Sequence, residues 1–210
     1  MSTWKLTSCA LIAASGVFVF ACASVLGIEQ ATLDPALDKA TTTDAGRKSL
    51  CDTYCDILSA NCTGNVEQFV SKDVCKPFCQ KLDPGTPGDT TGNSVNCRLT
   101  YAKLAKSAGE TSDNCSIAGP GGNGQCGTNC DALCTVALKT CATEVSAFVD
   151  VNQCDAECTR LPDVGHFDDS IQDNFNVQCR LYHVSAAQLD PQLHCPHVRG
   201  IGKCNAQSPP

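Results

Sequence analysis

Sixteen of the 18 cysteines fall into two sets of eight with closely matching spacing. The first five cysteines of each set are separated by the same steps of 4, 7, 13 and 4 residues, and the last three drift by only a few residues. Other residues recur with them, since Cys97-Arg98-Leu99 matches Cys179-Arg180-Leu181. This pattern predicts two tandem copies of one small unit, repeat 1 at residues 47–127 and repeat 2 at residues 128–206.

The cysteine content also indicates the compartment. Eighteen cysteines in 210 residues exceed the 8% that is typical of an exported disulfide scaffold. Small units that cannot bury much apolar surface are usually held by disulfides, which persist only in oxidising compartments. A reduced zinc protein would need C-x2-C pairs, whereas the close pairs here are all C-x3-C.

The spacing favours helices. Cys51, Cys55 and Cys62 fall within about 40° on one face of a helix, and Cys75 and Cys79 lie on one face of the next. A tight hairpin of two such helices can form two parallel bridges. We therefore expect an all-α, disulfide-rich fold of two tandem three-helix units with twin CxxxC helical hairpins. The expected hairpin bridges are Cys51–Cys79, Cys55–Cys75, Cys130–Cys158 and Cys134–Cys154.

A third helix is predicted around residues 94–107 and 170–187. We expect its cysteine to lock it onto the hairpin and the last two cysteines to close a terminal loop. Eight cysteines permit 105 connectivities, so this pairing is a hypothesis. Beside the third-helix cysteine, Arg98 and Arg180 are expected to pair with a carboxylate. The remaining expected bridges are Cys62–Cys97, Cys115–Cys126, Cys141–Cys179 and Cys195–Cys204.

The N-terminus has the pattern of an export signal. Lys5 precedes an apolar run from residue 9 to residue 20, too short for a permanent membrane span. The run ends in Val19-Phe20-Ala21-Cys22, which resembles a bacterial lipobox. We expect a signal peptide at 1–21, lipidation of Cys22 and a tether up to residue 46. The alternative is ordinary cleavage after Ala21-Cys22-Ala23, which would give a secreted or periplasmic soluble protein.

The segment Ser24-Val25-Leu26-Gly27-Ile28-Glu29 resembles the lead segment of myxobacterial-type lipoproteins. The words Cys-Arg-Leu-Tyr-His and His-Cys-Pro-His, at residues 179–183 and 194–197, are similar to those of uncharacterised cysteine-rich bacterial lipoproteins. By this resemblance, Ala23 after the lipidated cysteine implies the outer membrane, with the lipid anchor in the bilayer and the folded part on its periplasmic or cell-surface face. The resemblance implies no activity.

Charge and motifs restrict the function classes. The net charge is −7 and no basic run could follow a phosphate backbone, so nucleic acid is not an expected partner. The chain has no G-x-S-x-G, H-E-x-x-H, Walker loop, C-x-x-C or C-x-x-C-H sequence. A non-catalytic binding or structural module, with an unknown protein or surface ligand, is therefore favoured over an enzyme.

The histidines suggest an alternative function. All four lie in repeat 2: His166, His183, His194 and His197. Tyr101, Asn114 and Ile117 stand at the repeat 1 positions that match the last three. His183, His194 and His197 could converge on one metal ion, or a haem iron, because imidazole is the commonest ligand where thiols are oxidised. The bland alternative is that His183 packs against a disulfide while His194 and His197 are exposed loop residues.

Overall fold

The computed structural model describes residues 43–106, 111–144 and 148–205, and these residues fold into eight α-helices without a β-strand. The all-α, disulfide-rich prediction is confirmed. The predicted signal peptide, Cys22 and most of the predicted tether lie outside the described residues. Within the described ranges, no helix has both the length and the apolar character needed to cross a membrane.

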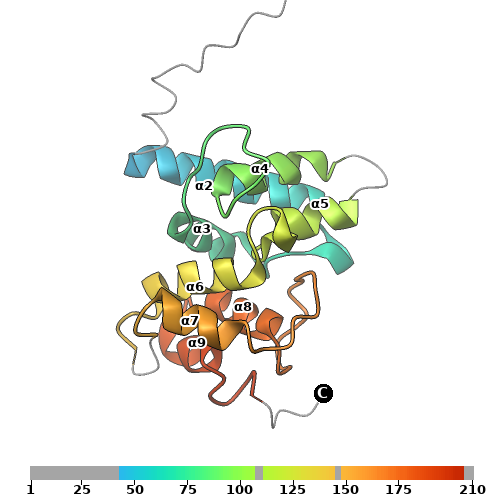
Figure 1. Ribbon diagram of the computed structural model, residues 1–210. Coiled ribbons are helices and arrows are strands. Elements are labelled where there is room, and N and C mark those ends of the chain that lie inside the picture. The colour runs from blue at the N-terminus through green and yellow to red at the C-terminus, as the bar shows by residue number, and fades with distance from the viewer. Residues whose placement is uncertain (1–42, 107–110, 145–147, 206–210) are drawn as a thin grey trace, which may run out of the picture. The chain divides into compact units, whose positions relative to one another are not determined.

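Each repeat contains the three expected helices and a short fourth one (Figure 1). The first helix of repeat 1 already begins at Asp44, within the expected tether. The fourth helices, α5 and α9, were not predicted, and each carries the seventh cysteine of its repeat. Repeat 1 consists of α2 (Asp44–Asn61), α3 (Lys72–Lys81), α4 (Val95–Leu104) and α5 (Thr111–Ala118). Repeat 2 consists of α6 (Asn129–Thr140), α7 (Val151–Cys158), α8 (Val177–Ala186) and α9 (Pro191–Val198).

Side-chain caps fix where the equivalent helices begin. Ser94 accepts a hydrogen bond from the backbone N–H of Cys97 at the start of α4, and Asn176 does the same for Cys179 at the start of α8. Such caps satisfy backbone donors that a helix leaves without partners. The third helix of repeat 2 therefore begins at Val177, not near residue 170 as predicted. Residues 165–176 form a loop instead.

The hairpin bridges are the four that the C-x3-C spacing predicts. In repeat 1, Cys51 bonds to Cys79 and Cys55 to Cys75, so that two bridges join α2 to α3. In repeat 2, Cys130–Cys158 and Cys134–Cys154 join α6 to α7 in the same way. The eight cysteines are buried or nearly so, which makes each pair of bridges part of the core.

The other four expected bridges are wrong. Cys62 bonds to Cys115 and not to Cys97, while Cys97 bonds to Cys126 and leaves no Cys115–Cys126 bridge. Repeat 2 has the same exchange, since the expected pairs Cys141–Cys179 and Cys195–Cys204 are replaced by Cys141–Cys195 and Cys179–Cys204. The reason is the unpredicted fourth helix, which presents its cysteine to the end of the first helix. The last cysteine then returns to the third helix.

Arg98 also differs from expectation, because it pairs with carbonyl groups and not with a carboxylate. Its side chain is fully buried, and it donates to the carbonyl oxygens of Gly119, Pro120 and Ser94 and to Oδ1 of Asn93. Burial lowers the pKa of this guanidinium to about 10. Arg98 thereby holds the glycine-rich loop between α5 and α6 against α4.

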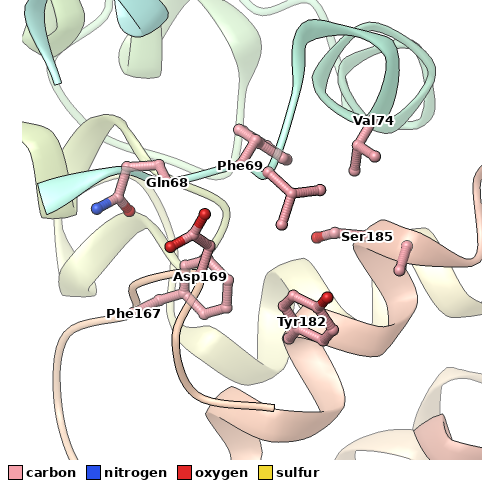
Figure 2. Close-up of a pocket in the computed structure, with 9 residues that line it drawn as sticks. Gln68, Phe69, Val74, Phe167, Asp169, Tyr182 and Ser185 are labelled. Carbon is pink, nitrogen blue, oxygen red and sulfur yellow. The ribbon is translucent and has the colours of Figure 1, made fainter. Parts of the chain in front are cut away.

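The two repeats contact each other directly. Helix α3 packs against α6 and α8, and Asn93 donates a hydrogen bond of 3.1 Å to the hydroxyl of Thr135. Figure 2 shows a narrow apolar pocket at this boundary, where Phe69 of repeat 1 lies opposite Phe167 and Tyr182 of repeat 2. Its lining is mainly apolar side chains of both repeats, so we assign it to packing.

Candidate metal centre

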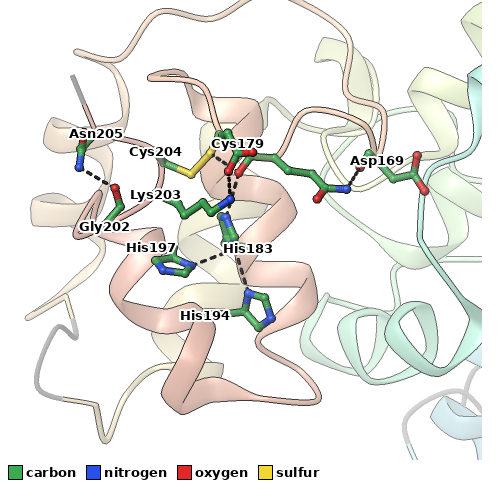
Figure 3. Close-up of polar contacts among 11 residues, drawn as sticks. Asp169, Cys179, His183, His194, His197, Gly202, Lys203, Cys204 and Asn205 are labelled. Carbon is green, nitrogen blue, oxygen red and sulfur yellow. Dashed lines mark hydrogen bonds and ion pairs between the residues drawn. A yellow bond between two sulfur atoms is a disulfide. The ribbon is translucent and has the colours of Figure 1, made fainter. Parts of the chain in front are cut away.

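Helices α8 and α9 bring three histidines together (Figure 3). His183 lies one turn after Cys179 on α8, while His194 and His197 flank Cys195 on α9. Asp190 caps α9 by accepting from the backbone N–H of Leu193, and Pro191 occupies its first turn. The Cys141–Cys195 bridge joins α9 to the end of α6. Both α9 histidines are thus carried by a short helix that is capped and covalently fixed.

The three rings approach through their nitrogens. Nδ1 of His183 lies 2.9 Å from Nδ1 of His194 and 3.4 Å from Nδ1 of His197. One ring nitrogen of each residue lies within 4.8 Å of those of the other two. His183 is buried, and His194 and His197 are partly buried. The predicted convergence of these three residues is confirmed.

A backbone carbonyl sets the tautomer of His183. Nε2 of His183 lies 3.0 Å from the carbonyl oxygen of Gln172, which can only accept a hydrogen bond. Nε2 therefore carries the proton, and in the neutral ring Nδ1 keeps its lone pair. A carbonyl that fixes the second ring nitrogen in this way is the usual outer partner of a metal-binding histidine.

The surroundings favour neutral rings. Burial, followed by the proximity of His197, lowers the pKa of His183 to about 4. Burial likewise lowers the pKa of His194 and of His197. All three rings are consequently neutral at pH 7, which is the protonation state that metal coordination requires.

The spacing fits a small transition-metal ion. A tetrahedral ion that binds imidazoles at about 2.0–2.1 Å has its ligand nitrogens about 3.3 Å apart. The two distances from Nδ1 of His183 lie on either side of this value. The three residues present nitrogen ligands without a carboxylate, a set that suits zinc or copper better than calcium or magnesium.

The fourth histidine of repeat 2 lies away from the cluster. His166 is exposed in the loop before α8 and takes no part in the cluster. Two groups beside His183 were not predicted from the sequence. The carbonyl of Gln172 gives no sequence signal because every residue has one. Cys204 was assigned to the wrong partner, and its bond to Cys179 places the bridge beside His183.

Comparison with known protein families gives a match to part of the chain. The model of the BfoA family C-terminal domain matches residues 20–131, which cover more than half of the sequence and all of repeat 1. The three histidines lie beyond the matched range. No curated protein and no solved structure matches the chain. This match shows that the protein belongs to the BfoA C-terminal domain family.

Proposed function

We propose that this protein is an exported, lipid-anchored binding module whose second repeat binds one transition-metal ion through His183, His194 and His197. The observation that carries the proposal is the approach of two imidazole nitrogens, Nδ1 of His194 and Nδ1 of His197, to Nδ1 of His183. A hydrogen bond between two rings accounts for the 2.9 Å contact of His183 with His194, but the ring nitrogen of His197 also faces the same lone pair at 3.4 Å. Zn²⁺ and Cu²⁺ are the candidate ions.

A haem fits the arrangement less well than a single ion. Two axial nitrogens of a haem lie on opposite sides of the macrocycle, about 4 Å apart with the ring between them. Here His183 and His194 approach to 2.9 Å, and the third ring reaches the same nitrogen. We therefore propose ion binding rather than haem binding.

The disulfide framework supports a binding or structural role more than catalysis. Eight bridges hold helices whose positions would otherwise depend on a small core. In this proposal, repeat 1 and the remaining surface of repeat 2 contact a protein or surface ligand. Repeat 2 adds the metal site to the same scaffold.

We further propose that Cys22 is acylated and attaches the module to the outer membrane. The lipobox-like Val19-Phe20-Ala21-Cys22 and the lead segment that resembles myxobacterial-type lipoproteins support this location. A lipid chain contributes about 0.8 kcal/mol per buried methylene, so more than one chain gives stable anchoring. Radiolabelled palmitate should enter the wild-type protein and not a Cys22→Ser variant; equal labelling of the two would contradict this attachment.

The metal proposal is tested by equilibrium titration of the mature, oxidised protein with Zn²⁺ or Cu²⁺. We expect one ion per chain, and loss of that ion in His183→Gln and in His194→Gln. His166→Gln is the matched control, because His166 is an exposed histidine of the same repeat. A wild-type protein that binds neither ion, or a loss in the control equal to that in His183→Gln, would contradict the proposal.

A further inference from the structure

The Cys179–Cys204 bridge lies beside the same histidine that anchors the proposed metal centre (Figure 3). One ligand atom from each of Cys179, His183 and Cys204 lies within 4.8 Å of the other two, and all three residues are buried. Cys179 and His183 are one helical turn apart on α8. His183 is therefore a member of two overlapping groups of potential metal ligands.

The two edges of the His183 ring face different groups. Nδ1 faces His194 and His197. Nε2 lies 3.0 Å from the carbonyl oxygen of Gln172, and Sγ of Cys179 lies 3.1 Å from that same oxygen. The Nε2 edge is thus on the side of the bridge. In the oxidised protein the bonded sulfurs are not thiolates, so the sulfur group is not a metal site.

We infer that reduction of Cys179–Cys204 creates a second metal site, formed by the two thiolates and Nε2 of His183, for a thiophilic divalent ion such as Zn²⁺ or Cd²⁺. A dithiol reductant supplies two electrons and two protons, breaks the S–S bond and becomes a disulfide itself. The ion then displaces the two thiol protons. Two cysteines and one histidine form a known three-ligand zinc set that leaves a fourth position for water. This inference goes beyond the three-histidine site and does not require that site to be loaded.

The chain around Cys204 has the freedom that the change requires. In a tetrahedral zinc site with Zn–S bonds of about 2.3 Å, the two sulfurs stand about 3.8 Å apart, so Cys204 must move outward. Residues 201–203 before it are exposed, and Gly200 and Gly202 have positive φ angles. Cys204 itself has a φ of 58°, in the left-handed region that few non-glycine residues adopt.

The two sites compete for His183. A neutral imidazole has one lone pair, so the ring offers either Nδ1 to His194 and His197 or Nε2 to the sulfurs. In the oxidised protein the hydrogen bond from Nε2 to the carbonyl oxygen of Gln172 leaves Nδ1 as the nitrogen that can bind an ion. Coordination through Nε2 would place the proton on Nδ1 and remove His183 from the three-histidine group. The redox state of one bridge would then decide which set holds the ion.

Repeat 1 supplies a matched control. Its equivalent bridge, Cys97–Cys126, also links the third helix to the end of the repeat, but Tyr101 stands in the place of His183. A phenol is a poorer ligand for a thiophilic ion than a neutral imidazole. Reduction of this bridge would give two thiols without an adjacent imidazole.

The test is alkylation of the intact mature protein after stepwise reduction by a dithiol, with and without Cd²⁺, followed by mass mapping of the labelled cysteines. We expect Cd²⁺ to protect Cys179 and Cys204 at least tenfold against alkylation and to leave Cys97 and Cys126 labelled. Protection should be accompanied by a thiolate-to-cadmium absorption band in the ultraviolet. His183→Gln should abolish both.

A His194→Gln/His197→Gln variant separates this inference from the proposed function. It lacks the three-histidine set, yet it should keep the protection of Cys179 and Cys204. Equal protection of both bridges in the wild-type protein would overturn the inference. So would protection that persists in His183→Gln, or labelling of Cys179 and Cys204 only together with all other cysteines.

Discussion

Tyr101 and His183 occupy equivalent positions in the two repeats, and each donates a hydrogen bond to a backbone carbonyl 11 residues earlier in its own repeat. The hydroxyl of Tyr101 lies 3.3 Å from the oxygen of Thr90, and Nε2 of His183 lies 3.0 Å from the oxygen of Gln172. The scaffold therefore orients a polar ring in the same way twice. The phenol of Tyr101 has no other polar atom, whereas the imidazole of His183 keeps a second ring nitrogen that can bind a metal ion. The proposed metal centre is therefore an addition to a framework that both repeats share.

The bridges that differ from the expected pairing give the first prediction. Peptides from the unreduced protein should contain Cys62 joined to Cys115 and Cys97 joined to Cys126. The Cys62–Cys115 bridge spans 53 residues, so Cys62→Ala/Cys115→Ala should lower the free energy of unfolding by about 4 kcal/mol. Removal of Cys55–Cys75, which spans 20 residues, should cost about 3 kcal/mol. Denaturant unfolding measures both, and a peptide that joins Cys62 to Cys97 would contradict the connectivity.

These bridges show what the sequence can and cannot predict. Two C-x3-C pairs on adjacent helices have only one parallel arrangement, so the hairpin bridges follow from spacing. Cys115 lies on α5, a helix of eight residues in a segment rich in polar residues and glycine, and its periodicity is too short to recognise. Without that helix, the partners of the third, sixth, seventh and eighth cysteines of each repeat could be assigned only by elimination.

The three histidines of the candidate site could be predicted from the sequence, but their arrangement could not. His183 and the pair His194 and His197 stand out because repeat 1 has no histidine at the matching positions. Their convergence depends on α9 packing against α8. The Cys141–Cys195 bridge, which fixes α9 to the end of α6, was not revealed by the spacing. The hydrogen bond from Nε2 of His183 to the carbonyl oxygen of Gln172 depends on the path of the loop before α8. A loop has no periodic sequence pattern from which this path could be predicted.

Gly202 gives the second prediction. A side chain at this position would lie 3.3 Å from the ring of His197, and the backbone has a φ of 84°. Gly202→Ala should therefore displace His197 and weaken metal binding about tenfold or more in a titration. Gly124→Ala is the matched control, because Gly124 also stands two residues before the last cysteine of its repeat. Its φ is 78°, and no neighbouring atom lies within 4 Å of the added carbon.

Both variants should lose similar stability from backbone strain, on the order of 1 kcal/mol. Only Gly202→Ala should lose metal affinity. If the two substitutions weakened metal binding equally, the contact with His197 would not be the cause.

The pH dependence of stability gives the third prediction. His183 has a pKa of about 4 in the folded protein against an ordinary value of 6.5, so the unfolded chain binds more protons between these two pH values. The contribution of His183 to stability is therefore fully present above pH 6.5 and is lost as the pH falls towards 4. Metal-free protein should show a midpoint of urea unfolding that falls across this window.

His183→Gln should flatten this fall, whereas His166→Gln, which changes an exposed histidine, should retain it. Parallel curves for wild type and His183→Gln would show that His183 titrates alike in both states. The lowered pKa of the buried His183 ring would then have to be abandoned.

The most direct measurement is anomalous X-ray diffraction from crystals of the oxidised protein loaded with Zn²⁺, collected on both sides of the zinc absorption edge. We predict one strong anomalous peak, about 2.0–2.1 Å from a ring nitrogen of each of His183, His194 and His197. A loaded crystal with its only zinc peak at His166 or at surface carboxylates, and no density among the three rings, would contradict the assignment of these histidines as a metal centre.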